Sequence, residues 1–177
     1  MGIFKRVKTI IKSQQKPEPV GKSENTLYDA KTGDIMEVDL TTYLISGKIE
    51  YYDPGFPDHR IAYYLQDGGM IRCLVIEKGR KDEVILCDFL EGALDNPEEV
   101  PSILVLDETK TFQLEMNSTD MARCYGKTDF RNLDEIMIWR YFADEDEHFY
   151  LQWQDGKYIA MIGEKIPPGM CRVIQND

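Results

Sequence analysis

The sequence predicts a mainly β fold, a β-rich α+β protein, in which two similar antiparallel β units pack together behind an N-terminal amphipathic helix. Three observations predict it. From residue 27 onward, short apolar runs alternate with Gly, Asp and Pro, a pattern typical of strands and turns. Several motifs recur in the same order in the second half of the chain. The first twelve residues carry a helical pattern that a polar, Pro-containing segment separates from the rest.

The first unit is expected to consist of strands joined by tight turns. Strands are predicted at residues 35–38, 42–45, 49–52, 61–66, 71–77 and 84–86. Gln66-Asp67-Gly68-Gly69 predicts a hairpin, because Asp-Gly tolerates the positive φ that the turn requires. A last strand is expected after the turn at 166–169, since Pro167 and Pro168 do not suit a central strand.

Repeated motifs predict the division into two units. Residues 27–32 match residues 106–111, Gly47-Lys48 matches Gly126-Lys127, Tyr64-Leu65-Gln66 matches Tyr150-Leu151-Gln152, and Asp67-Gly68 matches Asp155-Gly156. The preserved order predicts two related units of about 75 residues that pack face to face. The predicted division is a helix at 1–12, a linker at 13–26, a first unit at 27–105 and a second at 106–177.

The first twelve residues predict a docking element. The apolar side of this helix is formed by Ile3, Phe4, Val7, Ile10 and Ile11, and its basic side by Lys5, Arg6, Lys8 and Lys12. Such a helix docks on an anionic membrane surface, or in an acidic or apolar groove of a partner. The alternative is a capping helix that packs back on the body.

Charge and length limit the class of protein. Residues 1–22 hold six Lys or Arg and one Glu, a net charge of +5, whereas the whole chain of 177 residues carries −11. The remaining −16 argues against nucleic-acid binding by the body, which has no basic surplus to neutralise phosphates. The absence of an 18-residue apolar run or a secretory signal predicts a cytoplasmic protein. Its four cysteines form no C-x-x-C pair and are expected to be reduced, partly buried thiols.

No motif for catalysis or for a cofactor is present. The chain has no Walker or Gly-x-Gly-x-x-Gly loop and no nucleophile elbow, and its two histidines lack a third metal ligand by spacing. We therefore predict a non-enzymatic protein without catalytic residues, metal or cofactor. The acidic run at 144–148 predicts either a solvated hairpin tip or a weak site for a divalent cation.

Aromatic and acidic residues predict a second binding surface. The residues proposed for it are Tyr51, Phe56, Tyr141 and Trp153, with Asp144, Glu145, Asp146 and Glu147. Successive side chains of a strand point to opposite faces, so one ring of a pair such as Tyr63-Tyr64 should enter the core while the other stays outside. These rings would hold a basic or apolar segment of a partner. The alternative is that they are ordinary cross-strand aromatic pairs.

The chain resembles an uncharacterised bacterial family, domain of unknown function 4178, over roughly residues 27–174. The motifs that carry the resemblance are Thr32-Gly33-Asp34-Ile35, Tyr43, Gly47-Lys48-Ile49, Tyr63-Tyr64-Leu65 and the block at 141–163. The resemblance implies a small, cytosolic, β-rich protein with an accessory role near membranes, in the setting of envelope stress or of polyamine-synthesis genes. It implies no reaction, and it makes polyamine capture by the acidic run a further alternative.

Taken together, the sequence predicts a non-enzymatic adaptor, peripheral to the inner face of the membrane or docked on a membrane-associated partner. The alternative is a soluble inhibitor or immunity-type protein, whose acidic body masks a basic surface on its partner. The sequence leaves the partner and the oligomeric state open.

Overall fold

A computed structural model describes residues 26–55, 59–91, 97–106, 108–144 and 146–174. Eleven strands form one antiparallel sheet within these residues. The strands are β1 Ile35–Val38, β2 Thr41–Tyr52, β3 Arg60–Asp67, β4 Met70–Glu77, β5 Glu83–Leu90, β6 Ile103–Leu106, β7 Lys110–Gly126, β8 Asp134–Phe142, β9 Glu147–Gln154, β10 Lys157–Ile166 and β11 Cys171–Ile174. Two three-residue 3₁₀ turns, η1 Pro97–Glu99 and η2 Pro168–Met170, are the helices of the described chain, and neither could cross a membrane.

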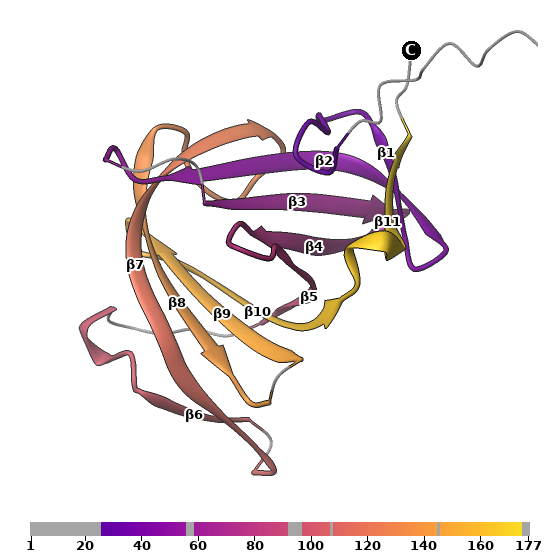
Figure 1. Cartoon of the computed structure of the whole chain (residues 1–177). Helices are drawn as coiled ribbons and strands as arrows, with labels where there is room; N and C mark the ends of the chain where they lie inside the picture. The colour runs from indigo at the N-terminus through magenta and orange to yellow at the C-terminus, as the bar shows by residue number, and fades with distance from the viewer. Residues whose placement is uncertain (1–25, 56–58, 92–96, 107, 145, 175–177) are drawn as a thin grey trace, which may run out of the picture.

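The sheet closes into an eight-stranded barrel (Figure 1). Its order is β2-β3-β4-β5-β10-β9-β8-β7, and β7 pairs with β2 from Gly47↔Gly126 to Tyr52↔Met121 to complete the ring. The barrel has two halves, β2–β5 and β7–β10, each a run of hairpin-connected strands. The halves meet at two seams, β2–β7 and β5–β10, so both edge strands of each half pair with an edge strand of the other half.

Turn residues fit the hairpins that they form. The predicted hairpin is confirmed, because β3 and β4 pair up to Asp67↔Met70 and Gly68 has a φ of +57°. Asp155 and Gly156, between β9 and β10, both have positive φ, as a primed two-residue turn demands. The predicted strands at 42–45 and 49–52 form one strand, β2, whose register shifts between Ile45 and Gly47.

Hydrophobic side chains fill the barrel and also cover its outside. The interior cluster takes residues from all eight strands and from the loop before β8, including Ile49, Tyr64, Ile85, Phe130 and Met161. Two arms cover the outer faces. The first arm, β1 and β11, packs on the outside of the first half, and the second arm, β6 with the start of β7, packs on the outside of the second half. The core is therefore three-layered, which buries both faces of most barrel strands.

The prediction of a β-rich fold is confirmed, but its internal arrangement differs. The two units do not pack face to face; they are the halves of one closed barrel, because hydrogen bonds at the seams join them edge to edge. The matched Tyr-Leu-Gln motifs lie in β3 and β9, the second strand of one half and the third strand of the other. The proposed helix at 1–12 and most of the linker lie outside the described residues.

Candidate functional site

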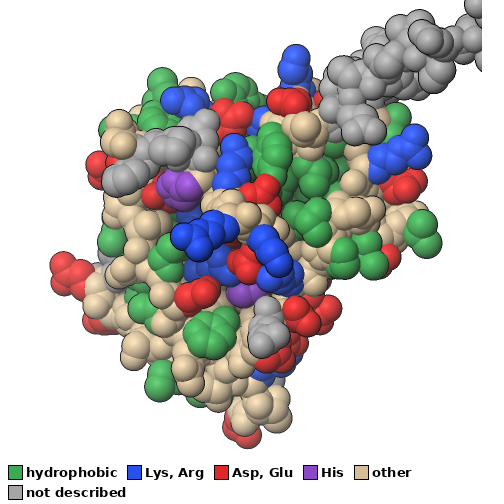
Figure 2. Space-filling view, in the orientation of Figure 1, with side chains coloured by type: hydrophobic (Ala, Val, Ile, Leu, Met, Phe, Trp, Pro, Cys, Tyr) green, Lys and Arg blue, Asp and Glu red, His purple; other side chains and the backbone are tan. Residues whose placement is uncertain are grey.

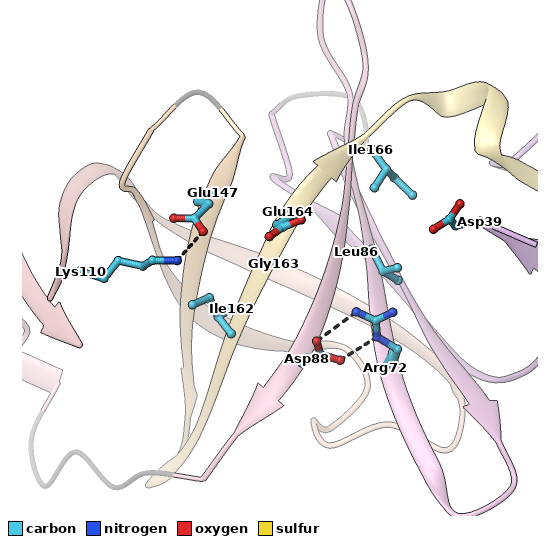
Figure 3. Close-up of a pocket in the computed structure, with 10 residues that line it drawn as sticks. All are labelled: Asp39, Arg72, Leu86, Asp88, Lys110, Glu147, Ile162, Gly163, Glu164 and Ile166. Atoms are coloured by element: carbon cyan, nitrogen blue, oxygen red, sulfur yellow. Dashed lines mark hydrogen bonds and ion pairs between the residues drawn. The ribbon is translucent and has the colours of Figure 1, made fainter. Parts of the chain in front are cut away.

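A recess on the outside of the barrel follows the β5–β10 seam (Figure 3). It has a volume of about 370 Å³, and we call it the seam groove. Its lining residues are Asp39, Arg72, Leu86, Asp88, Lys110, Glu147, Ile162, Gly163, Glu164 and Ile166. Asp39 comes from the first arm, between β1 and β2, and Lys110 from the second arm, at the start of β7. The groove therefore lies where each arm ends and the strands of the seam remain uncovered.

Neighbouring strands of the two halves supply the apolar floor of the groove. Leu86 comes from β5, while Ile162 and Ile166 come from β10. Gly163 lets these two strands approach, since a Cβ at this position would lie 2.4 Å from Cys87 Sγ and 2.7 Å from the Leu86 carbonyl oxygen. A larger residue would force the strands apart at the floor of the groove.

Two ion pairs flank the groove. Arg72 binds Asp88 through two hydrogen bonds, Nε to Oδ1 at 2.6 Å and Nη2 to Oδ2 at 3.0 Å. Lys110 reaches across from the second arm and donates a hydrogen bond to Glu147. Figure 3 shows Glu164 between these two pairs.

Two further carboxylates line the groove and make no ion pair with a described residue, those of Asp39 and Glu164. With Arg72 and Lys110 set against four carboxylates, the lining carries a net charge of −2. An apolar floor below uncompensated carboxylates suits a cationic group on an aliphatic stem.

A second recess, of about 430 Å³, lies at the other seam, β2–β7. It is lined by Tyr28, Asp29, Lys31, Thr32, Lys48, Glu50 and Tyr125. Its Lys48 is nearly buried, with Nζ 2.8 Å from Glu50 Oε1 and 3.1 Å from the Tyr28 carbonyl oxygen. The charged groups of this recess balance, so it lacks the acidic surplus of the seam groove.

One end of the barrel interior holds a network of buried charges. Arg60 is 1% exposed and binds Glu77 through Nε at 2.7 Å and Asp120 through Nη1 at 3.0 Å. His59 Nε2 lies 3.0 Å from the same Asp120 oxygen, and this hydrogen bond raises the pKa of His59. Burial opposes the charge on Asp120, but the bonds from His59 and Arg60 outweigh burial and lower its pKa.

Arg140 organises the rest of this network. Its Nη2 binds Glu83 at 2.7 Å and lies 3.5 Å from Nδ1 of His148. Burial opposes ionisation of Glu83, but hydrogen bonds from Lys165 and Arg140 overcome it and lower the Glu83 pKa to about 2. Burial, and then Arg140, lower the pKa of His148, so its imidazole is neutral at pH 7.

These interior groups have fixed charges and mutual partners, which suits a structural role. Arg60 Nη2 and His148 Nε2 are buried without a hydrogen-bond partner among the described residues, and a buried water can satisfy such donors. Figure 2 shows both histidine side chains on one face of the molecule, with Lys and Arg side chains gathered between them. In the described part of the chain, no group of three or more His, Cys, Asp or Glu side chains is placed to hold a metal ion.

The predicted aromatic surface is wrong for Tyr51 and Tyr141, which are 1% and 0% exposed. Tyr51 points into the barrel and donates a hydrogen bond to Gln152 Oε1 at 2.8 Å. Tyr141 points outward, but the second arm covers it and its hydroxyl binds the Pro101 carbonyl. The same holds for Tyr63 and Tyr64: the two rings take opposite faces as predicted, but both are buried because the first arm covers the outer face.

The remaining predicted site residues fall in different places. Trp153 is half-buried and packs against Tyr158, with ring centroids 6.4 Å apart. Asp144 Oδ1 accepts hydrogen bonds from the backbone N–H groups of Asp146 and Glu147, which fixes the turn between β8 and β9. Glu147 enters β9 and lines the seam groove. Phe56, Glu145 and the docking residues at 1–12 lie outside the described residues.

Sequence reasoning missed most of the seam groove. Its residues come from five strands and one turn, and no two neighbouring positions form a motif. The cross-strand pair Arg72↔Asp88 is opposite in charge, but its register becomes known only from the fold. Of the groove residues, Glu147 alone was among the predicted site residues.

Comparison with known families fits this β-rich architecture. A family model described as domain of unknown function, DUF4178, matches residues 31–168. The chain belongs to the DUF4178 family. The matched region begins before β1 and ends after β10, so the whole barrel lies inside the DUF4178 match. No curated protein and no solved structure matches the chain.

Proposed function

We propose that this DUF4178 protein is a non-enzymatic adaptor, whose N-terminal segment attaches it to the membrane and whose seam groove holds a basic segment of a protein partner. One observation supports the groove as the partner-binding surface. Its apolar floor lies beneath Asp39 and Glu164, two carboxylates without an ion pair among the described residues. A partner's Lys or Arg would lay its aliphatic stem on this floor and its charge against the carboxylates.

Charge distribution supports the two attachments. Residues 1–22 carry +5 and the rest of the chain −16. An anionic membrane on the cytoplasmic side attracts the basic segment by about 1 kcal/mol for each Lys or Arg near the surface, and it repels the acidic barrel. The barrel would then stand off the membrane with its groove accessible to a partner.

Vesicle co-sedimentation tests the membrane attachment. The full chain and a variant lacking residues 1–22 would be mixed with anionic and with neutral vesicles. We expect the full chain alone to sediment, and with anionic vesicles only. Equal sedimentation of both proteins, or none by either, would refute the membrane attachment.

A charge substitution in the groove tests the partner surface. Glu164→Gln removes an unpaired carboxylate from the groove without removing an ion pair. We expect it to weaken binding of a labelled peptide of alternating Leu and Lys by up to about fivefold, the range of one exposed ion pair. Glu135→Gln is a matched control outside the groove. If both variants bind the peptide equally, the groove is not the partner surface.

A further inference from the structure

The seam groove already contains one ammonium group, that of Lys110. This side chain starts on the second arm, reaches Glu147 on β9 and lines the groove together with Glu164 (Figure 3). We infer that the groove is selective for a Lys or Arg side chain, and that Lys110 occupies the position of this cation until a partner's cation displaces it from Glu147. This inference rests on the proposed function.

The two ion pairs of the groove differ in how firmly they are held. Arg72 is a quarter exposed and makes two hydrogen bonds to Asp88, so its position is fixed by geometry as well as by charge. The Lys110 side chain is 42% exposed, and its one hydrogen bond to a described side chain goes to Glu147. An exposed single-contact pair contributes little free energy, and Lys110 can swing into solvent at low cost. Glu147 is therefore the carboxylate that the protein can offer to a ligand.

Charge explains why the incoming group must be cationic. When Lys110 leaves, Glu147 joins Asp39 and Glu164 as a third uncompensated carboxylate of the groove, while Asp88 keeps its partner. A neutral or anionic side chain would leave these carboxylates facing each other across an apolar floor. An ammonium or guanidinium restores the net charge of −2 that the groove has with Lys110 in place.

The test compares substitutions of Lys110 in the full chain, with the labelled Leu-Lys peptide as probe and fluorescence anisotropy as the measurement. Lys110→Met removes the competing ammonium, and we expect up to about fivefold tighter binding than in the wild type. Lys157→Met is the matched control, because it removes a lysine of similar exposure, 52% against 42%, and its pair with Asp129 outside the groove. Adding Glu147→Gln to Lys110→Met should abolish the gain.

Each outcome decides a different claim. A gain in Lys110→Met that exceeds the gain in Lys157→Met and depends on Glu147 supports displacement. Equal gains would show that only net charge matters, and weaker binding by Lys110→Met would show that Lys110 assists the ligand; either result overturns the inference. If wild type and both single variants fail to bind the peptide, or bind it without regard to Glu164, the proposed function fails together with the inference.

Discussion

Replacement of Arg60 by Met should destabilise the barrel far more than the same replacement at the surface. Arg60 is the one cation in direct hydrogen-bond contact with both Glu77 and Asp120 among the described arginines and lysines. The carboxylate side chains are only 11% and 3% exposed, so removing the guanidinium leaves Glu77 with the longer contact to Arg140 Nη1 at 3.8 Å and Asp120 with His59, both poorly solvated. Breaking a buried ion pair in this way costs about 3–5 kcal/mol. For a domain of this size that corresponds to a Tm lower by roughly 6–20 °C.

Arg131→Met is the matched control. Arg131 pairs with Asp155 at 2.5 Å, but both side chains are more than 60% exposed, and such pairs contribute about 0–1 kcal/mol. Urea unfolding followed by fluorescence of Trp139 and Trp153 gives the free energy of unfolding of each variant. If Arg60→Met loses no more stability than Arg131→Met, the buried network does not stabilise the fold as argued.

Three further predictions follow from the same structure. A raised folded-state pKa for His59 contributes stability that is present below about pH 6.5 and is lost as the pH rises through the folded pKa. The stability difference between wild type and His59→Gln should therefore shrink as the pH rises above about 6.5 in urea titrations, and a difference that is constant or grows would contradict this. Gly163→Ala should cost about 1–3 kcal/mol in the same assay, because its Cβ meets the β5 backbone, and a neutral result would mean that the seam yields easily. Burial raises the pKa values of the Cys73 and Cys87 thiols, so a thiol reagent should modify them only after unfolding, as mass spectrometry of timed samples would show.

Strand positions were predictable because they depend on local alternation. The runs at 35–38, 61–66 and 71–77 lie within one residue of β1, β3 and β4. Where a strand is irregular, the local pattern fails: the predicted break at 46–48 is the register shift inside β2, not a turn. Burial of both faces could not be read from the sequence, because the arms that cover the outer faces come from distant parts of the chain.

Barrel closure and the seam groove could not be predicted from local sequence patterns, because both depend on residues that are far apart in the sequence. The closing pairs, β2 with β7 and β5 with β10, join residues that are more than 65 positions apart. Recurring motifs pointed to two related units, but the same motifs are compatible with two packed sheets and with two halves of one barrel. The order of the motifs does not distinguish these two arrangements. The hydrogen bonds at the two seams of the structure do distinguish them. The groove exists only at a seam, so its residues carry no signal until the seam is known.

If the groove binds a partner as proposed, the interior network serves stability and the groove serves binding. Several interior contacts join one half of the barrel to the other: Arg60 to Asp120, Tyr51 to Gln152, Tyr150 to Glu77 at 3.1 Å, and Arg140 to Glu83. Because the two partners of each contact lie on opposite halves, substitution of either partner should lower the stability of the closed barrel. Groove residues such as Glu164 and Lys110 lie on the outside of the barrel wall, where a change should alter the proposed ligand contacts and leave the closing interactions intact. A groove variant that lowers the free energy of unfolding, or an interior variant that changes peptide binding, would therefore show that the groove and the barrel interior are energetically coupled.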